Sequence, residues 1–103
     1  MKVMMKVNMS TEEGNMLVKQ GKLNGTIKAI LEEQKPEAAY FTADYGKRTA
    51  FLFFDMQESS EIPKLAEPWF LTLGAGIDMR PVMAPEDLAK AIPTFEAIAK
   101  KYG

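Results

Sequence analysis

Histidine and cysteine, which carry much of the nucleophilic and metal chemistry of proteins, are both absent from this chain. Their absence excludes zinc sites with nitrogen or sulfur ligands, cysteine-ligated iron–sulfur clusters, histidine-ligated haem, Ser-His-Asp triads and Cys-His pairs. Disulfides are excluded too, so the hydrophobic core must hold the fold together by itself. The side chains that remain for chemistry are basic, amide and aromatic ones: Lys6, Asn8, Tyr40, Trp69 and Arg80. We predict no cofactor and no metal, and no catalytic residue is assigned.

The composition is that of one globular domain spanning residues 1–103, with 47% hydrophobic and 26% charged residues. A formal net charge of −1 gives no basic excess for nucleic acid or anionic lipid. The longest apolar stretches, such as residues 50–54, are far too short to span a membrane, and the N-terminus does not resemble a signal peptide. We therefore expect a cytoplasmic protein with no nucleic-acid or membrane partner.

Hydrophobic periodicity predicts strands alternating with helices along the chain. A helix starting at a Ser10–Glu13 capping box, a tight hairpin at Tyr45–Gly46 and a Pro85 helix start mark the main boundaries. The expected strands are 2–8, 38–44, 47–56 and 77–83, and the expected helices are 10–35, 59–73 and 84–102. This order, β-α-β-β-α-β followed by α, is the ferredoxin-like α+β arrangement. Its sheet is antiparallel, in order 4-1-3-2, with both crossover helices on one face.

Glycines and prolines leave some helix boundaries open. Gly14, Gly21 and Gly25 in the first helix indicate either close packing against a backbone or a break near Asn24–Gly25. Pro68 is expected to kink or split the second helix, because its ring clashes with a carbonyl of the preceding turn. The last helix is expected to be interrupted at Ile92–Pro93 for the same reason.

The alternation of side chains separates the predicted strands into one wholly apolar face and one mixed face. A two-residue turn at Tyr45–Gly46 pairs Tyr40 with Phe51 and Thr42 with Thr49, which puts these residues together on the mixed face. Their neighbours, including Phe41, fall together on the apolar face, so the register and the polarity agree. The apolar face should therefore lie under the helices.

The mixed face is too aromatic to stay exposed and too charged for an ordinary core. We expect a homodimer in which two such faces enclose a cavity that binds a ligand. Lys6 and Arg80 should pair with Asp55 and Asp78, or with a ligand, because a buried cation needs a partner. The expected ligand-binding residues are Lys6, Asn8, Tyr40, Phe51, Phe53, Trp69 and Arg80. Two alternatives stay open: a monomer whose helix 84–102 folds back over this face, and Trp69 as a core anchor rather than a pocket wall.

The chain resembles the dimeric α+β-barrel superfamily in the order of its strands and helices. Residues 67–73, 76–83 and 84–91 are similar to a group of small uncharacterised prokaryotic proteins. The superfamily includes cofactor-independent quinol monooxygenases, muconolactone isomerases, haem-dependent enzymes and amino-acid-binding regulatory domains. The resemblance implies a dimer with a cavity, but the haem branches need a histidine that is absent here. Asn8, Trp69 and Arg80 are the possible counterparts of the Asn, Trp and Arg of the quinol monooxygenases, although their spacing matches no motif of that family.

Three functions follow from this pattern. The leading one is a homodimer that binds a small aromatic or acidic molecule on the mixed face of the sheet. The second is a cofactor-independent monooxygenase or isomerase, in which a pocket lysine or Tyr40 would act as the base. The third is an interaction module whose sheet face binds another protein and encloses no cavity.

Overall fold

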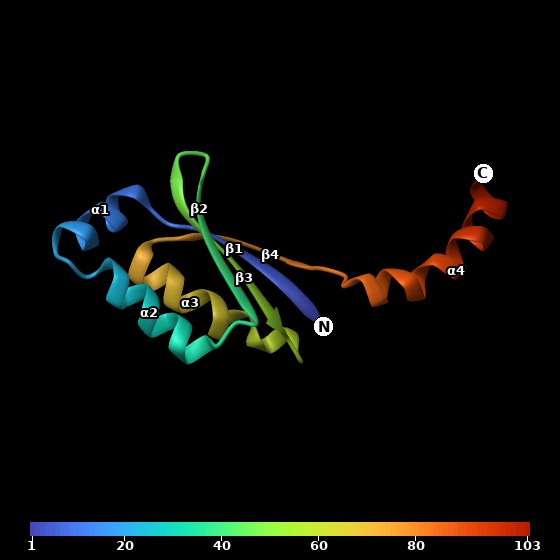
Figure 1. Cartoon of the computed structure of the whole chain (residues 1–103), viewed down its shortest axis with the longest axis horizontal. Helices are drawn as coiled ribbons and strands as arrows, with labels where there is room; N and C mark the ends of the chain where they lie inside the picture. The colour runs from blue at the N-terminus through green and yellow to red at the C-terminus, as the bar shows by residue number, and fades with distance from the viewer.

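The computed structural model describes all 103 residues and contains one antiparallel sheet in the order β2-β3-β1-β4 (Figure 1). The strands are β1 (Lys2–Asn8), β2 (Ala38–Asp44), β3 (Lys47–Asp55) and β4 (Gly76–Pro81). The helices are α1 (Thr11–Lys19), α2 (Leu23–Gln34), the short 3-10 helix η1 (Ser59–Glu61), α3 (Ile62–Leu73) and α4 (Pro85–Tyr102). The fold is therefore a ferredoxin-like α+β domain with an additional C-terminal helix, and the predicted strand order is confirmed.

The β2–β3 hairpin has the register that the sequence predicts. Tyr40 lies opposite Phe51, and Thr42 lies opposite Thr49. The two turn residues, Tyr45 and Gly46, have φ angles of 52° and 72°. Positive φ at both central residues is the requirement of a type I′ turn, whose twist matches that of the flanking strands. The turn therefore holds the register and the two faces of the sheet in place.

The first helical segment is broken, as one of the two open alternatives proposed, but the break comes earlier than Asn24–Gly25. Gly21 adopts a φ of 69° between α1 and α2, whereas Gly25 lies inside α2. The other alternative, close packing against a backbone, is not found. Gly14 is buried in α1, but an added Cβ there would come within 2.7 Å of a side-chain atom, Arg48 Nη1, and nothing lies within 4 Å at Gly21 or Gly25. The segment 10–35 therefore forms two helices, α1 and α2, instead of one.

The two internal prolines do not divide their helices. Helix α3 continues through Pro68 and α4 continues through Pro93, so the predicted interruption at Pro93 is wrong. A proline removes one helical N–H, but its cost is reduced where the freed carbonyl finds another donor. Lys64 O, which Pro68 cannot serve, lies 3.5 Å from Gln34 Nε2, and the corresponding carbonyl in α4 belongs to the solvent-exposed Ala89.

The core lies between the sheet and helices α2 and α3, on the face predicted to be apolar. Its fully buried members include Met5, Leu52, Trp69 and Leu73. Helix α4 takes no part in it and extends away from the sheet, as Figure 1 shows. The Cα radius of gyration is consequently 17.4 Å, against about 13 Å for a compact chain of this length. The alternative in which residues 84–102 fold back over the sheet is therefore wrong for this chain.

Candidate ligand-binding site

The face of the sheet opposite α2 and α3 carries no helix, and we call it the open sheet face (Figure 1). Pairing places Tyr40, Phe51, Lys6 and Asp78 in one row across the four strands. The next row contains Ala38, Phe53, Met4 and Arg80. Five of the seven predicted ligand-binding residues therefore lie in two adjacent rows.

The aromatic residues of the open sheet face form an apolar platform on β2 and β3. The rings of Tyr40 and Phe53 meet edge to face, with centroids 6.5 Å apart and an interplanar angle of 78°. Tyr40 is 65% exposed, and Phe51 and Phe53 are half-buried. Exposing this apolar surface to water costs free energy, and its rings can stack on a planar ligand.

Lys6 pairs with Asp44, a partner that the sequence prediction did not choose. Lys6 Nζ lies 2.5 Å from Asp44 Oδ2 and 5.3 Å from the centroid of the Tyr45 ring. Asp44 Oδ2 is buried and accepts no hydrogen bond, so the charge of Lys6 is its compensation. The alternation of side chains places Asp44 on the same face as Lys6, and this was the signal in the sequence that could have indicated the pair. Predicting the contact itself requires the three-dimensional path of the hairpin end.

Arg80 has the predicted partner, because its guanidinium forms an ion pair with Asp78 on the same strand. Both side chains are at least half exposed, so Arg80 is not a buried cation. Asp55 is too far along the strand to serve Lys6 and binds the Met1 amino group at 2.9 Å. This hydrogen bond and the positive charge lower the pKa of the Asp55 carboxyl below its ordinary value.

Asn8 lies at the hairpin end of the open sheet face. Its Nδ2 donates to Thr49 Oγ1 at 3.0 Å, and Thr49 Oγ1 donates to Lys47 O at 3.0 Å. Thr49 is almost completely buried. The amide oxygen of Asn8 has no hydrogen-bond partner in the chain, so it remains free to accept one from a ligand.

Trp69 is not brought together with the other six predicted residues. It projects from α3 into the core on the helix side of the sheet and is fully buried. Its indole Nε1 donates to Gln34 Oε1 at 3.2 Å, while Gln34 Nε2 donates to Leu65 O at 2.8 Å. The core-anchor alternative therefore describes its position. Gln34 was missed by sequence reasoning, although the N–H that Pro68 lacks was a signal that a nearby carbonyl needs a donor.

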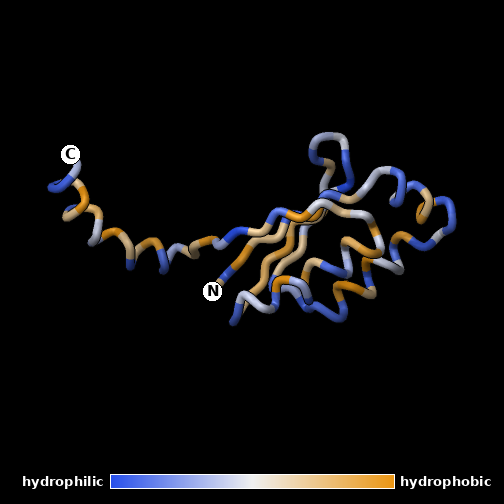
Figure 2. Tube along the Cα trace, turned by 180° about the vertical axis from the view of Figure 1, so that it is seen from behind, coloured by the Kyte–Doolittle hydropathy of each residue, from blue (hydrophilic) through white to orange (hydrophobic).

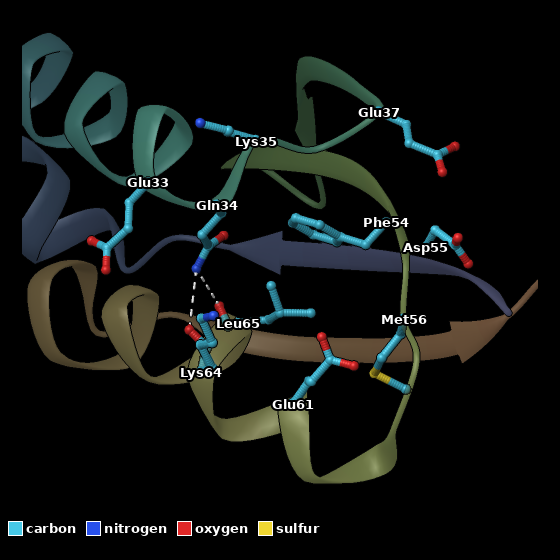
Figure 3. Close-up of a pocket in the computed structure, with 10 residues that line it drawn as sticks. All are labelled: Glu33, Gln34, Lys35, Glu37, Phe54, Asp55, Met56, Glu61, Lys64 and Leu65. Carbon is cyan, nitrogen blue, oxygen red and sulfur yellow. Dashed lines mark hydrogen bonds between the residues drawn. The ribbon is translucent and has the colours of Figure 1, made fainter.

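A cavity of about 250 Å³ lies at the other side of the domain, between the C-terminus of α2, helix α3 and the end of β3 (Figure 3). Phe54, Met56 and Leu65 form its apolar surface, and charged side chains surround them. Several of these charges are already engaged; Glu61, for example, accepts the N–H groups of Gln57 and Glu58. None of the predicted ligand-binding residues lines this cavity.

No cluster of acidic residues in the chain has the geometry of a metal site. No helix is both long enough and apolar enough to cross a lipid bilayer. The polar groups of the open sheet face include Lys6, Arg80, Asn8 and the hydroxyl of Tyr40, together with the carboxylates of Asp44 and Asp78 that pair with the two cations.

No protein-family model matches the sequence, and no curated protein matches it. Among solved structures, the chain is similar to 5-chloro-2-hydroxyhydroquinone dehydrochlorinase (TftG) from Burkholderia phenoliruptrix AC1100, in complex with 2,5-dihydroxybenzoquinone. The TM-score is 0.63 at 14% identity, and the match covers 84% of this chain and 97% of that one.

Two further similarities are weaker. The de novo designed protein Ferredog-Diesel matches with a TM-score of 0.45 at 10% identity, over 79% of this chain and 85% of that one. A formyltetrahydrofolate deformylase from Pseudomonas putida KT2440 matches with a TM-score of 0.44 at 15% identity. That match covers 79% of this chain but only 28% of the deformylase. The comparison with the dehydrochlorinase supports the ferredoxin-like α+β fold, which is what the chain shares with it.

Proposed function

We propose that this protein binds a small aromatic or acidic molecule on the open sheet face, and that two copies pair through this face to enclose the ligand. The observation that carries the proposal is the juxtaposition of Tyr40, Phe51 and Phe53 with two cationic side chains on a surface that no helix covers. A freely solvated sheet face has no physical need for three aromatic residues in neighbouring positions.

The polar contacts define the class of ligand. Lys6 and Arg80 are each paired with one carboxylate inside the chain. A carboxylate, phenolate or enolate oxygen of a ligand can join or displace these partners, while its ring stacks on the aromatic platform. Asn8 adds a free amide oxygen for a ligand hydroxyl. A planar ring with an acidic substituent can therefore contact both the aromatic platform and the cationic side chains.

A second copy is needed to enclose such a ligand. None of the cavities of the single chain is lined by Lys6, Tyr40, Phe51 or Phe53, so the single chain does not enclose a ligand that contacts them. Binding sites for small molecules bury most of the ligand surface. Two open sheet faces in contact supply this burial, and a two-fold axis makes both faces equivalent.

The test uses 2,5-dihydroxybenzoquinone as the probe, because it combines a planar ring with acidic hydroxyl groups. It is titrated against the wild type, Lys6→Ala and Arg80→Ala by calorimetry. Loss of a charge-assisted hydrogen bond costs about 1.5–3 kcal/mol, so each variant should bind about tenfold to a hundredfold more weakly. Lys28→Ala, which removes the same charge from α2 on the helix side, is the matched control and should bind like the wild type.

Unchanged binding in both Lys6→Ala and Arg80→Ala contradicts the assignment of the site. Equal weakening in Lys28→Ala shows that the probe responds to overall charge rather than to this face. Absence of any binding by a chain that is monomeric in solution favours the interaction-module alternative.

A further inference from the structure

Helix α4 has a continuous apolar stripe, none of whose residues is buried against the rest of the chain. Leu88, Ile92, Phe95, Ile98 and Tyr102 recur at helical spacing and are 42% to 77% exposed. The opposite side of the helix is polar, and hydrophobic and hydrophilic segments alternate along it in Figure 2. A helix of 18 residues with no buried residue and five exposed large apolar side chains is incomplete as an isolated element.

The segment that connects β4 to α4 directs the helix away from its own sheet. Val82 N–H donates to Lys2 O at 3.0 Å, which keeps the chain attached to β1 up to this residue. Ala84 is extended, with φ −74° and ψ 164°, as expected for a residue before a proline. Its N–H donates to Asp87 Oδ2 at 2.9 Å and caps the helix. Pro81 and Pro85 fix φ at the two ends of this connection, and no part of the chain covers the stripe beyond it.

The stripe begins at the β4 edge of the open sheet face. Val82 is on that face by the alternation of β4 and lines a shallow groove together with Met83 and Leu88. Leu88 is the first residue of the α4 stripe. Apolar surface therefore continues from Val82, at the edge of the sheet, through Met83 onto the first turn of the helix.

The area of these two surfaces fits one interface of ordinary size. Large apolar side chains that are about half exposed each offer about 100 Å², so the stripe contributes about 500 Å². That is less than the roughly 800 Å² per partner of a stable interface. Tyr40, Phe51 and Phe53 on the open sheet face supply the remainder. Neither surface is sufficient alone, whereas the two together are.

The charge of α4 argues against a lipid surface as the occupant. The helix contains three acidic residues, Glu86, Asp87 and Glu96, and three basic residues, Lys90, Lys100 and Lys101. Amphipathic helices that bind anionic membranes carry a basic excess on the polar face, which this helix lacks. A second protein surface with matching apolar area is the better partner.

We propose that α4 is an arm that packs on a second copy of this chain, so that each subunit of a two-fold dimer both extends an arm and receives one. The inference rests on the proposed pairing through the open sheet face and adds the element that completes it. The prediction is specific because the arm is separable from the ligand-binding residues, none of which lies in α4.

The test compares Phe95→Glu with Ala97→Glu in the full-length protein. Both substitutions add the same charge at solvent-exposed positions of α4, one on the stripe and one on the opposite side. The dimer dissociation constant is measured by sedimentation over a series of protein concentrations. We expect Phe95→Glu to raise it by about a hundredfold or more, because each dimer contains two copies of the substitution, and Ala97→Glu to leave it unchanged.

A cross-link identifies the surface that receives the arm. The chain has no cysteine, so Ile98→Cys can be labelled uniquely with a photoreactive benzophenone. The proposal requires adducts between chains, at twice the chain mass, with the attachment point in the body of the partner. Circular dichroism of every variant confirms that it is folded.

The other outcomes overturn the arm in different ways. If the wild type is a dimer and both glutamate variants remain equally dimeric, the proposal that α4 packs on the partner is wrong, while the proposed pairing of sheet faces stands. If the wild type is a monomer and the adducts are all within one chain, α4 folds back on its own domain, and both proposals fail. Binding of a monomer to anionic vesicles, lost in Phe95→Glu, assigns the stripe to a membrane instead.

Discussion

Gln34 connects the ends of α2 and α3 and gives a sharp test of how the core is completed. Its amide oxygen accepts from Trp69 Nε1 at 3.2 Å. Its Nε2 donates to Leu65 O at 2.8 Å, and Lys64 O lies 3.5 Å away (Figure 3). The substitution Gln34→Leu keeps a side chain of similar size and good helix propensity but removes all these interactions.

The magnitude follows from burial. Trp69 is 0% exposed, and its indole N–H has no other hydrogen-bond partner in the chain when Gln34 is replaced. A buried donor without a partner costs about 1–3 kcal/mol, whereas the carbonyl of Lys64, a residue with an exposed side chain, can be solvated. We therefore expect Gln34→Leu to lower the free energy of unfolding by about 2 kcal/mol. For a domain of this size that corresponds to a fall of about 10 °C in Tm.

The assay is urea denaturation followed by circular dichroism and by the fluorescence of Trp69, the only tryptophan in the chain. Gln20→Leu is the matched control, because Gln20 is exposed and its side chain makes no hydrogen bond. This control should stay within about 0.5 kcal/mol of the wild type. If Gln34→Leu is as stable as Gln20→Leu, the hydrogen bond to Trp69 contributes nothing, and the reasoning from burial is refuted.

Two further predictions concern the charged groups of the sheet. Asp44→Asn removes the counter-charge of Lys6, whose side chain is 21% exposed. It should lower the free energy of unfolding, measured by urea denaturation, by about 1 kcal/mol. It should also raise the affinity for an acidic probe, because Lys6 is then free to pair with the probe. A fall in affinity would show that Asp44 positions Lys6 rather than competing for it. The hydrogen bond and charge of Glu37 raise the pKa of Lys2 above 10.5, so this pair stabilises the fold below pH 10.5 and loses its effect as the pH rises through the raised pKa. The difference in stability between the wild type and Glu37→Gln should therefore become smaller as the pH is raised above 10. Urea midpoints of both proteins, measured at increasing pH, test this prediction, and a difference that stays constant would contradict it.

Much of the fold was predictable because strands and turns are determined by neighbours in the sequence. The two-residue turn at Tyr45–Gly46 dictates which residues of β2 and β3 face each other, and alternation then sorts both faces. Helix continuity was less predictable. Both α3 and α4 continue through a proline, and in α3 the carbonyl left without a helical donor lies 3.5 Å from Nε2 of Gln34, a residue more than thirty positions away from Pro68.

The candidate site was also predictable only in part. Parity placed Lys6, Tyr40, Phe51, Phe53 and Arg80 on one face, because the side-chain period of a strand is a local property. Parity could not choose among Asp44, Asp55 and Asp78 as the partner of Lys6, since all three share that face.

Trp69 and α4 mark the boundary between what the sequence by itself determined and what only the tertiary structure decided. Periodicity shows that both belong to amphipathic helices, because it depends on residues three and four positions apart. It does not say which surface each apolar stripe meets. The tertiary structure buries the stripe of α3, with Trp69, against the helix side of the sheet, and it leaves the stripe of α4 exposed beyond the connection that follows β4. The physical reason is that burial is a property of the space between elements, and that space exists only after the sheet and its helices have assembled.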